Sequence, residues 1–143
     1  MLSNTCKYAI RAVVYLSVYG SEQKKIGIKE ISAALDIPSP FLSKILQTMA
    51  RKKILNSIKG PHGGFSLGRP AVDISIMDIV EIIDGTDIFD TCLVRTTHCS
   101  DEEPCGIHDK ITAIRKETKA LLINQTIEDL ATEFRRDKGR IKI

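Results

Sequence analysis

Apolar residues recur every three or four positions in six segments of the chain, and polar, Gly- or Pro-containing breaks separate these segments. This spacing places the apolar side chains on one face of a helix. Gly20, Gly27 and Gly85 stand at segment ends, where glycine favours the start or the stop of a helix. The pattern predicts a mainly α fold with helices over residues 8–17, 28–35, 40–51, 76–83, 107–123 and 127–134.

The second and third predicted helices are joined by a short break that favours a helix-turn-helix. Pro38 cannot continue the earlier helix. Ser39 and Pro40 restart the chain, with Ser39 as the expected N-cap and Pro40 at the first helical position. In a helix-turn-helix the second helix enters the DNA major groove; a generic helical hairpin is the alternative. The outer face of the third helix is polar and basic, with Ser43, Lys44, Gln47, Thr48 and Arg51.

The next segment predicts a β-hairpin. Residues 54–59 favour a strand, residues 60–64 a glycine-rich turn, and residues 65–67 a returning strand. A hairpin directly after a helix-turn-helix is a wing, in which Lys59 and His62 can face phosphates or a narrow minor groove. A phosphate-binding nucleotide loop is the alternative, but the segment lacks the Lys-Ser/Thr ending of such loops.

The predicted long helix carries a heptad-like seam. Its members recur at alternating spacings of four and three, which favours packing against another helix. The same helix of a second subunit is the economical partner, because helix-turn-helix proteins usually bind two-fold DNA sites as dimers. Packing of the seam on its own domain is the alternative. The seam consists of Ile107, Ile111, Ile114, Thr118 and Leu121.

The net charge of +3 conceals a strong asymmetry. Residues 37–72 contain six basic and no acidic side chains, whereas residues 84–103 contain six carboxylates and one arginine. A basic block inside an ordinary domain indicates a polyanionic partner, here double-stranded DNA with a palindromic site. No apolar run approaches the roughly 18 residues that span a bilayer, and no secretory signal, catalytic pair or cofactor loop is present. We therefore expect a cytoplasmic protein that is not an enzyme and has no membrane partner or small-molecule substrate.

Three of the four cysteines crowd, with one histidine, into a polar stretch before the long helix. Their order is Cys92-x6-Cys99-x5-Cys105-x2-His108, and the last two lie one turn apart at the start of that helix. Thiolates bind iron and zinc strongly, and imidazole can replace one thiolate on either metal. Because structural disulfides are uncommon in cytosolic proteins, the grouping indicates metal or redox chemistry.

The spacing favours an iron–sulfur cluster. Structural zinc usually draws on two cysteines separated by two to four residues, whereas gaps of six and five suit a looser loop around a larger cluster. Zinc and a metal-free thiol switch are the alternatives at this site, and an iron–sulfur electron carrier is the alternative for the whole protein. Cys6 is expected to be a packing residue, and His98 to be solvated.

The segments at residues 8–12, 40–46 and 57–65, followed by the Cys-Cys-Cys-His set, resemble the IscR/NsrR/CymR family of bacterial transcription regulators. The resemblance covers nearly the whole chain in order. It implies a winged-helix homodimer with a long crossing helix, and repression or activation controlled by an iron–sulfur cluster. It also implies that Cys92, Cys99, Cys105 and His108 match the ligands of a [2Fe–2S] cluster in IscR-like members.

The resemblance further implies DNA contacts by Pro40, Phe41, Ser43 and Lys44 on the helix and by Lys59 and its glycine neighbours in the wing. With Gln47 from the outer face and His62 from the turn added, the predicted DNA-contacting set is Pro40, Phe41, Ser43, Lys44, Gln47, Lys59, Gly60, His62, Gly63 and Gly64.

The chain departs from the family pattern at three places. Its first cysteine gap has six residues, where IscR-like members typically have five. Ser43 stands where those members carry an acidic residue that discriminates between classes of DNA site. Lys7 stands where some nitric-oxide-sensing members supply an aspartate ligand, which argues against a [4Fe–4S] cluster. The sequence thus predicts a winged helix-turn-helix domain (1–84), a cluster-binding loop (85–106), and a C-terminal dimerisation helix with a tail (107–143).

Overall fold

The computed structural model describes residues 1–137 and 143, so most of the predicted C-terminal tail lies outside the described residues. The described part contains six α-helices, one antiparallel hairpin and two short 3-10 turns. The predicted mainly α fold with a β-hairpin wing is confirmed. The elements are α1 (Asn4–Tyr19), α2 (Ile28–Leu35), α3 (Ser39–Arg51), β1 (Leu55–Ile58), β2 (Gly64–Leu67), the turn Ala71–Asp73, α4 (Ile76–Ile83), the turn Asp87–Phe89, α5 (His108–Asn124) and α6 (Ile127–Arg136).

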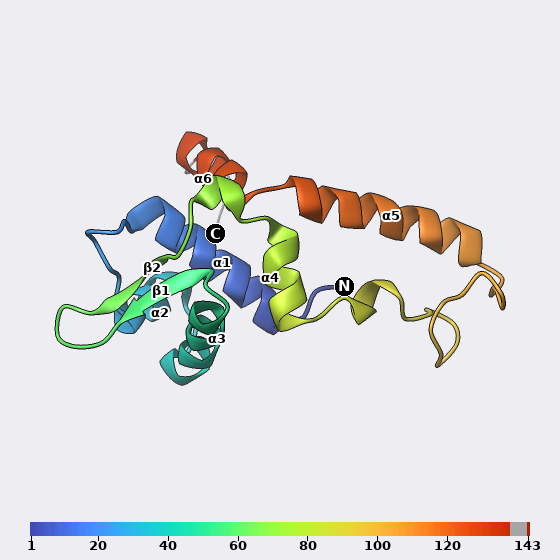
Figure 1. The fold of residues 1–143 in the computed structure, drawn as a ribbon, viewed down its shortest axis with the longest axis horizontal. Coiled ribbons are helices and arrows are strands. Elements are labelled where there is room, and N and C mark those ends of the chain that lie inside the picture. The colour runs from blue at the N-terminus through green and yellow to red at the C-terminus, as the bar shows by residue number, and fades with distance from the viewer. Residues whose placement is uncertain (138–142) are drawn as a thin grey trace.

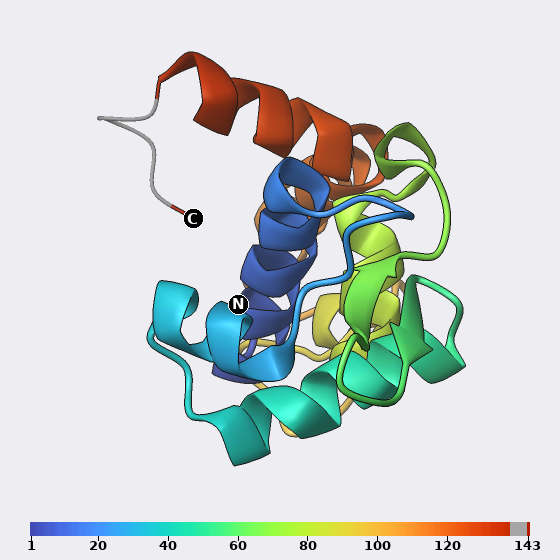
Figure 2. The ribbon, with the colours of Figure 1, turned by 90° about the vertical axis from the view of Figure 1, so that its left-hand side faces the viewer.

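Helix α1 is the centre of the folded body, with α3 and the hairpin toward one end and α6 across the other (Figure 2). Its Ala9, Val13 and Leu16 are fully or almost fully buried, and the apolar faces of α2, α3, α4 and α6 cover them. The amphipathic spacing seen in the sequence therefore supplies one contiguous core, which is the main source of stability for helices as short as α2 and α4.

The start of α1 is tied to the end of α4. Ser3 caps α1 by accepting a hydrogen bond from the Cys6 amide at 3.0 Å. The Ser3 amide donates to Asp84 Oδ2 at 2.8 Å, and its hydroxyl donates to the other oxygen of the same carboxylate. Cys6 is fully buried beneath this contact, and burial together with the Asp84 charge raises the pKa of its thiol to about 12. Cys6 is therefore a packing residue, as expected.

Helix α6 returns the chain to the body after α5. Thr126 and Ser75 each form a capping box, at the starts of α6 and α4 respectively. Between them a short backbone bridge joins the two segments, with Ile76 N donating to the Gln125 carbonyl at 2.9 Å and Ile127 N to the Ile74 carbonyl at 2.8 Å. This bridge fixes the end of α5 against the winged body.

Helix α5 projects away from the body, and the segment from residue 85 to residue 107 runs out alongside it to its start (Figure 1). Only His108 and Leu122 of this helix are buried. Three of the five predicted seam residues are exposed, namely Ile107 at 39%, Ile114 at 56% and Leu121 at 61% of their full surface. The other two, Ile111 and Thr118, are half-buried. No helix in the described part of the chain is long and apolar enough to cross a membrane.

The start of α3 differs in detail from the prediction. Asp36 adopts a left-handed conformation (φ 54°) that ends α2, and Pro38 rather than Ser39 is the N-cap of α3. The Pro38 carbonyl accepts hydrogen bonds from the amides of Phe41 and Leu42 at 3.1 and 2.9 Å. The predicted capping by Ser39 is wrong, because the turn closes one residue earlier and makes Ser39 the first helical residue.

We expect Ile127→Ala to lower the free energy of unfolding by roughly 2–5 kcal/mol, because it deletes a fully buried side chain at the junction that anchors α6. Val72→Ala is the matched control, since Val72 is 61% exposed and its truncation should change stability by less than about 0.5 kcal/mol. Urea unfolding of both variants checks this. Similar small losses for both would show that α6 is not part of the cooperative core.

Candidate nucleic-acid interface and cysteine loop

The outer face of α3 is free for contacts. Its apolar stripe, Leu42, Ile45, Leu46 and Met49, is buried against the body. The opposite side chains therefore point outward, and Pro40, Lys44 and Gln47 are exposed while Ser43 is half-buried. Arg11 fixes the preceding turn from α1, because its guanidinium donates to the Leu35 carbonyl at 2.8 Å at the end of α2.

Phe41 has a double role in this interface. Its ring packs edge-on against Tyr8 of α1, with ring centroids 5.8 Å apart, yet 41% of the residue stays exposed. The aromatic contact orients the first turn of α3 and leaves part of Phe41 accessible to solvent.

The wing has a third partner that the sequence did not reveal. Strands β1 and β2 pair from Leu55↔Leu67 to Ile58↔Gly64. Ile26, in the α1–α2 connection, adds to β2 through two backbone hydrogen bonds with Phe65, both 2.9 Å. The base of the wing is thereby held to the body.

Two wing glycines are required by close backbone approach. A Cβ at Gly64 (φ 150°) would lie 2.6 Å from the backbone of Ile26, and one at Gly63 would lie 2.0 Å from the Ile58 carbonyl oxygen. Gly60 has an open surrounding but a φ of 108°, a conformation that side-chain-bearing residues rarely adopt. The glycines thus shape the turn, and the exposed Lys59 and His62 are carried on it.

A groove of about 470 Å³ separates α3 from the wing. Ser43 and Gln47 line one side, Lys59, Gly60, Gly63 and Gly64 line the other, and the start of α2 contributes Gly27 and Ile28. Most of the predicted DNA-contacting residues therefore lie on one continuous surface made of α3 and the wing.

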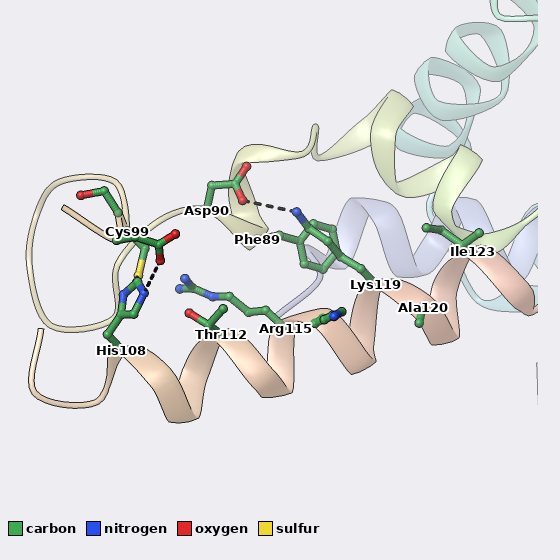
Figure 3. Close-up of a pocket in the computed structure, with 12 residues that line it drawn as sticks. Phe89, Asp90, Cys99, His108, Thr112, Arg115, Lys119, Ala120 and Ile123 are labelled. Atoms are coloured by element: carbon green, nitrogen blue, oxygen red, sulfur yellow. Dashed lines mark hydrogen bonds and ion pairs between the residues drawn. The ribbon is translucent and has the colours of Figure 1, made fainter. Parts of the chain in front are cut away.

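The four predicted metal ligands lie in two pairs. Cys99 Sγ is 3.2 Å from His108 Nδ1, and the other ring nitrogen, Nε2, lies 2.9 Å from Asp101 Oδ1 (Figure 3). Cys92 and Cys105 form the second pair, beside Arg95. Within the described residues, no group of three or more Cys, His, Asp or Glu side chains is placed to hold one metal ion.

The Cys92 pair is set in a polar turn. The backbone N–H groups of Val94 and Arg95 lower the pKa of the Cys92 thiol, and the neighbouring Cys105 and the Arg95 charge add to this. The Arg95 N–H lies 3.4 Å from Cys92 Sγ. The Arg95 guanidinium in turn pairs with the Glu103 carboxylate at 2.7 Å and reaches the Glu103 carbonyl at 2.9 Å, which closes the loop on itself.

Polar contacts also tie the cysteine loop to α5. Lys119 pairs with Asp90 at 3.3 Å and lies over the Phe89 ring at 5.3 Å (Figure 3). Arg115 donates a hydrogen bond to the Thr91 carbonyl. Between the loop and this side of α5 lies an open cleft of about 570 Å³, which Cys99 and His108 also line. A neighbouring side of α5 carries a more apolar groove of about 540 Å³, which Ile111, Ile114 and Leu93 line, and Arg115 borders both hollows.

Several residues of these two sites carry no signal in the sequence. Ile26 is a single apolar position in a polar connection, so periodicity gives no signal for it. Asp101 and Glu103 are two of six carboxylates in the segment, and only the folded loop singles them out. His98 is exposed, as expected.

A helix-turn-helix followed directly by a hairpin wing defines a DNA-binding transcription regulator of the winged-helix class. A family model described as Rrf2, iron-dependent transcriptional regulator, matches residues 2–133. The chain belongs to this family, whose members are regulators and not enzymes. The resemblance seen in the sequence is thereby confirmed.

Similarity to individual proteins supports the family assignment. The chain is 31% identical over 132 residues to a candidate HTH-type transcriptional regulator of Aquifex aeolicus, covering 91% of this chain and 90% of the relative. The structure of this chain is similar to that of CymR, the global cysteine regulator of B. subtilis (TM-score 0.79, 21% identity, 93% of this chain and 97% of CymR covered). It is also similar to IscR of T. potens (TM-score 0.73, 17% identity, 100% and 93%). These two structures establish the shared fold.

We expect Gly64→Ala to destabilise the protein by roughly 1–3 kcal/mol and to detach the wing, because the added methyl group meets the Ile26 backbone in a strained conformation. Gly106→Ala is the control, since a Cβ there meets nothing within 4 Å. Urea unfolding and amide exchange of Ile26 and Phe65 report the effect. Unchanged protection of these two amides in Gly64→Ala would contradict the role given to the Ile26 bridge.

Proposed function

We propose that the protein acts in the cytoplasm as a homodimeric transcription regulator that binds a palindromic DNA operator under the control of a [2Fe–2S] cluster. The observation that carries this proposal is the position of α5, which bears the proposed dimer seam and begins at a predicted cluster ligand, His108. The DNA-reading surface and the cysteine loop are otherwise separate parts of the molecule (Figure 1).

The DNA contacts lie on the surface formed by α3 and the wing. The α3 residues Pro40, Phe41, Ser43, Lys44 and Gln47 face the major groove. Exposed Lys59 and His62 on the wing face the adjacent phosphates or minor groove, with Gly60, Gly63 and Gly64 shaping their turn.

A second copy of the chain covers the exposed face of α5. The seam residues Ile107, Ile111, Ile114, Thr118 and Leu121 follow one stripe of the helix, and Ile107, Ile114 and Leu121 are between 39% and 61% exposed. Leu93, in the cysteine loop, is 67% exposed and lines the same groove as Ile111 and Ile114. Dimer formation therefore buries part of the cysteine loop together with the seam.

The donor chemistry of the loop fits an iron–sulfur cluster held by Cys92, Cys99, Cys105 and His108. Three thiols and an imidazole are a suitable ligand set. Cys99 and His108 are already close enough to share one metal ion, with Nδ1 of the ring toward the thiol and Nε2 held by Asp101. When bound, such a cluster supplies sensitivity to oxidants and to iron supply.

Joining the two ligand pairs requires the loop to move. The Arg95–Glu103 contacts hold one pair, and Lys119–Asp90 and Arg115–Thr91 hold the loop to α5. A rearrangement of these contacts acts on His108 at the start of α5, and α5 transmits it to the seam and to the spacing of the two recognition helices. A coupling of roughly 1–3 kcal/mol between the loop and DNA binding is typical of such proteins.

Anaerobically purified protein should show the visible absorption of a cluster, and the triple variant Cys92→Ala, Cys99→Ala, Cys105→Ala should be colourless. The operator affinities of the two proteins should differ by about 5- to 150-fold, because the loop biases the dimer geometry. Cys6→Ala is the control and should keep both properties. A colourless wild type containing zinc would support the zinc alternative, a wild type lacking metal with linked thiols would support the thiol switch, and equal affinities would overturn control by the loop.

Ile114→Glu should dissociate the dimer, because the seam would have to bury an unpaired charge. Ala113→Glu places the same charge on the neighbouring exposed position, outside the seam, and should leave the dimer intact. Analytical ultracentrifugation distinguishes the two outcomes. A dimer that survives Ile114→Glu unchanged would remove this stripe of α5 from the interface.

A further inference from the structure

One pair of polar side chains on the exposed face of α3 is already linked in the free protein. Gln47 Nε2 donates a hydrogen bond to Ser43 Oγ at 3.2 Å. The two residues are four positions apart, so they lie on the same face of the helix, and both line the groove between α3 and the wing. Their polar groups therefore point to the surface that meets DNA in the proposed function.

The neighbouring polar side chains of α3 are engaged along the helix. Thr48 donates its hydroxyl to the Lys44 carbonyl at 2.9 Å, and Arg51 donates to the same hydroxyl oxygen at 3.1 Å. Gln47 can form further hydrogen bonds, because a carboxamide has two N–H donors and one carbonyl acceptor. The contact with Ser43 uses one N–H, and among the hydrogen bonds of the described residues none involves Gln47 Oε1.

We propose that Gln47 reads an adenine in the major groove and that Ser43 is its positioning residue. Adenine presents the N6 amino group as donor and N7 as acceptor on its major-groove edge. Gln47 Oε1 accepts from N6, and the second N–H of Nε2 donates to N7. The first N–H stays on Ser43. This inference rests on the proposed docking of α3 in the major groove.

The paired acceptor and donor of the Gln47 carboxamide fit the other bases less well. Guanine presents two acceptors, so Gln47 Oε1 would face an oxygen or nitrogen lone pair. Cytosine offers a donor only, and thymine an acceptor beside a methyl group. Only adenine satisfies both free groups of Gln47 at once, and an unmatched buried polar group loses its hydrogen bond to water.

Ser43 contributes by limiting the freedom of the Gln47 side chain. A glutamine side chain that is ordered only on binding loses rotamer entropy at that step. The 3.2 Å contact restricts Gln47 before DNA arrives. The discrimination for adenine should therefore fall in Ser43→Ala even though Gln47 is unchanged, while binding to unrelated duplexes should remain the same.

The test begins with the full-length wild-type protein and a random-sequence DNA duplex pool, from which the preferred site is selected. At one position of each half-site we expect adenine, and replacing it should weaken wild-type binding by about 5- to 150-fold. Gln47→Ala should lose the preference at that position alone. Arg51→Ala is the matched control on the same helix: Arg51 lies outside the predicted DNA-contacting set, so its removal should leave the base preference at this position unchanged.

Base analogues then locate the contact. Replacing the adenine by 7-deazaadenine, which lacks N7, should weaken wild-type binding by about 2- to 12-fold and should have no effect on Gln47→Ala. Ser43→Ala should show an intermediate loss of discrimination.

The outcomes separate this inference from the proposed function. A wild type that selects no sequence would overturn operator binding itself. A wild type that selects a site whose base preferences are the same in Gln47→Ala, or that responds to 7-deazaadenine as strongly in Gln47→Ala as in wild type, would overturn the adenine contact and leave operator binding standing.

Discussion

A helix of 17 residues with only two buried side chains has little tertiary packing of its own to stabilise it. Helix α5 is in this position, since it leaves the winged body and exposes Ile114, Leu121 and Ile123 to water. Its two ends are nevertheless fixed: the C-terminal end by the backbone bridge at Ile76 and Ile127, and the N-terminal end by the loop contacts around His108. The apolar stripe of α5 therefore needs a partner surface to bury it, and this need is the basis of the proposed dimer. Because the same helix joins the cysteine loop to the winged body, it also provides the route by which a change in the loop would reach the DNA-binding surface.

The cysteine loop and the seam are joined through the same helix but use different sides of it. The polar contacts of Arg115 and Lys119 with the loop lie beside the cleft that holds Cys99 and His108, while Ile111 and Ile114 line the apolar groove with Leu93. A change in loop conformation would therefore alter a surface that the proposed dimer buries. Contacts of Arg95 with Glu103 and of Asp101 with His108 close the loop on itself. Bringing all four predicted metal ligands together would therefore compete with these contacts.

The order and type of the elements could be predicted from the sequence because the helices follow an apolar period and several begin or end at a recognisable glycine. Gly20 ends α1, Gly27 caps α2, and the turn at residues 59–63 separates β1 from β2. The N-cap of α3 could not be predicted correctly, since the left-handed Asp36 moved the turn by one residue. The Ile26 bridge depends on a contact across 39 positions, which no local pattern encodes.

In the candidate sites, too, the residues could be predicted from the sequence but their contacts could not. The sequence identified the cysteines, His108 and the α3 face by residue type and spacing, but the separation into two ligand pairs and the Gln47–Ser43 contact depend on side-chain directions in the folded chain. The fold predicted from the sequence agrees with the structure over most of the chain, and the Rrf2 family model matches residues 2–133 of it.

In the proposed function the cysteine loop and the dimer seam are coupled through α5. The most direct measurement is the dimer dissociation constant of one protein preparation, determined by sedimentation first with the metal bound and then after anaerobic removal of the metal by a chelator. Coupling requires the two constants to differ, because by linkage any change in dimer affinity on metal binding equals the change in metal affinity on dimerisation. Identical constants, with metal removal verified by the loss of visible absorption, would show that the loop and the seam are not coupled.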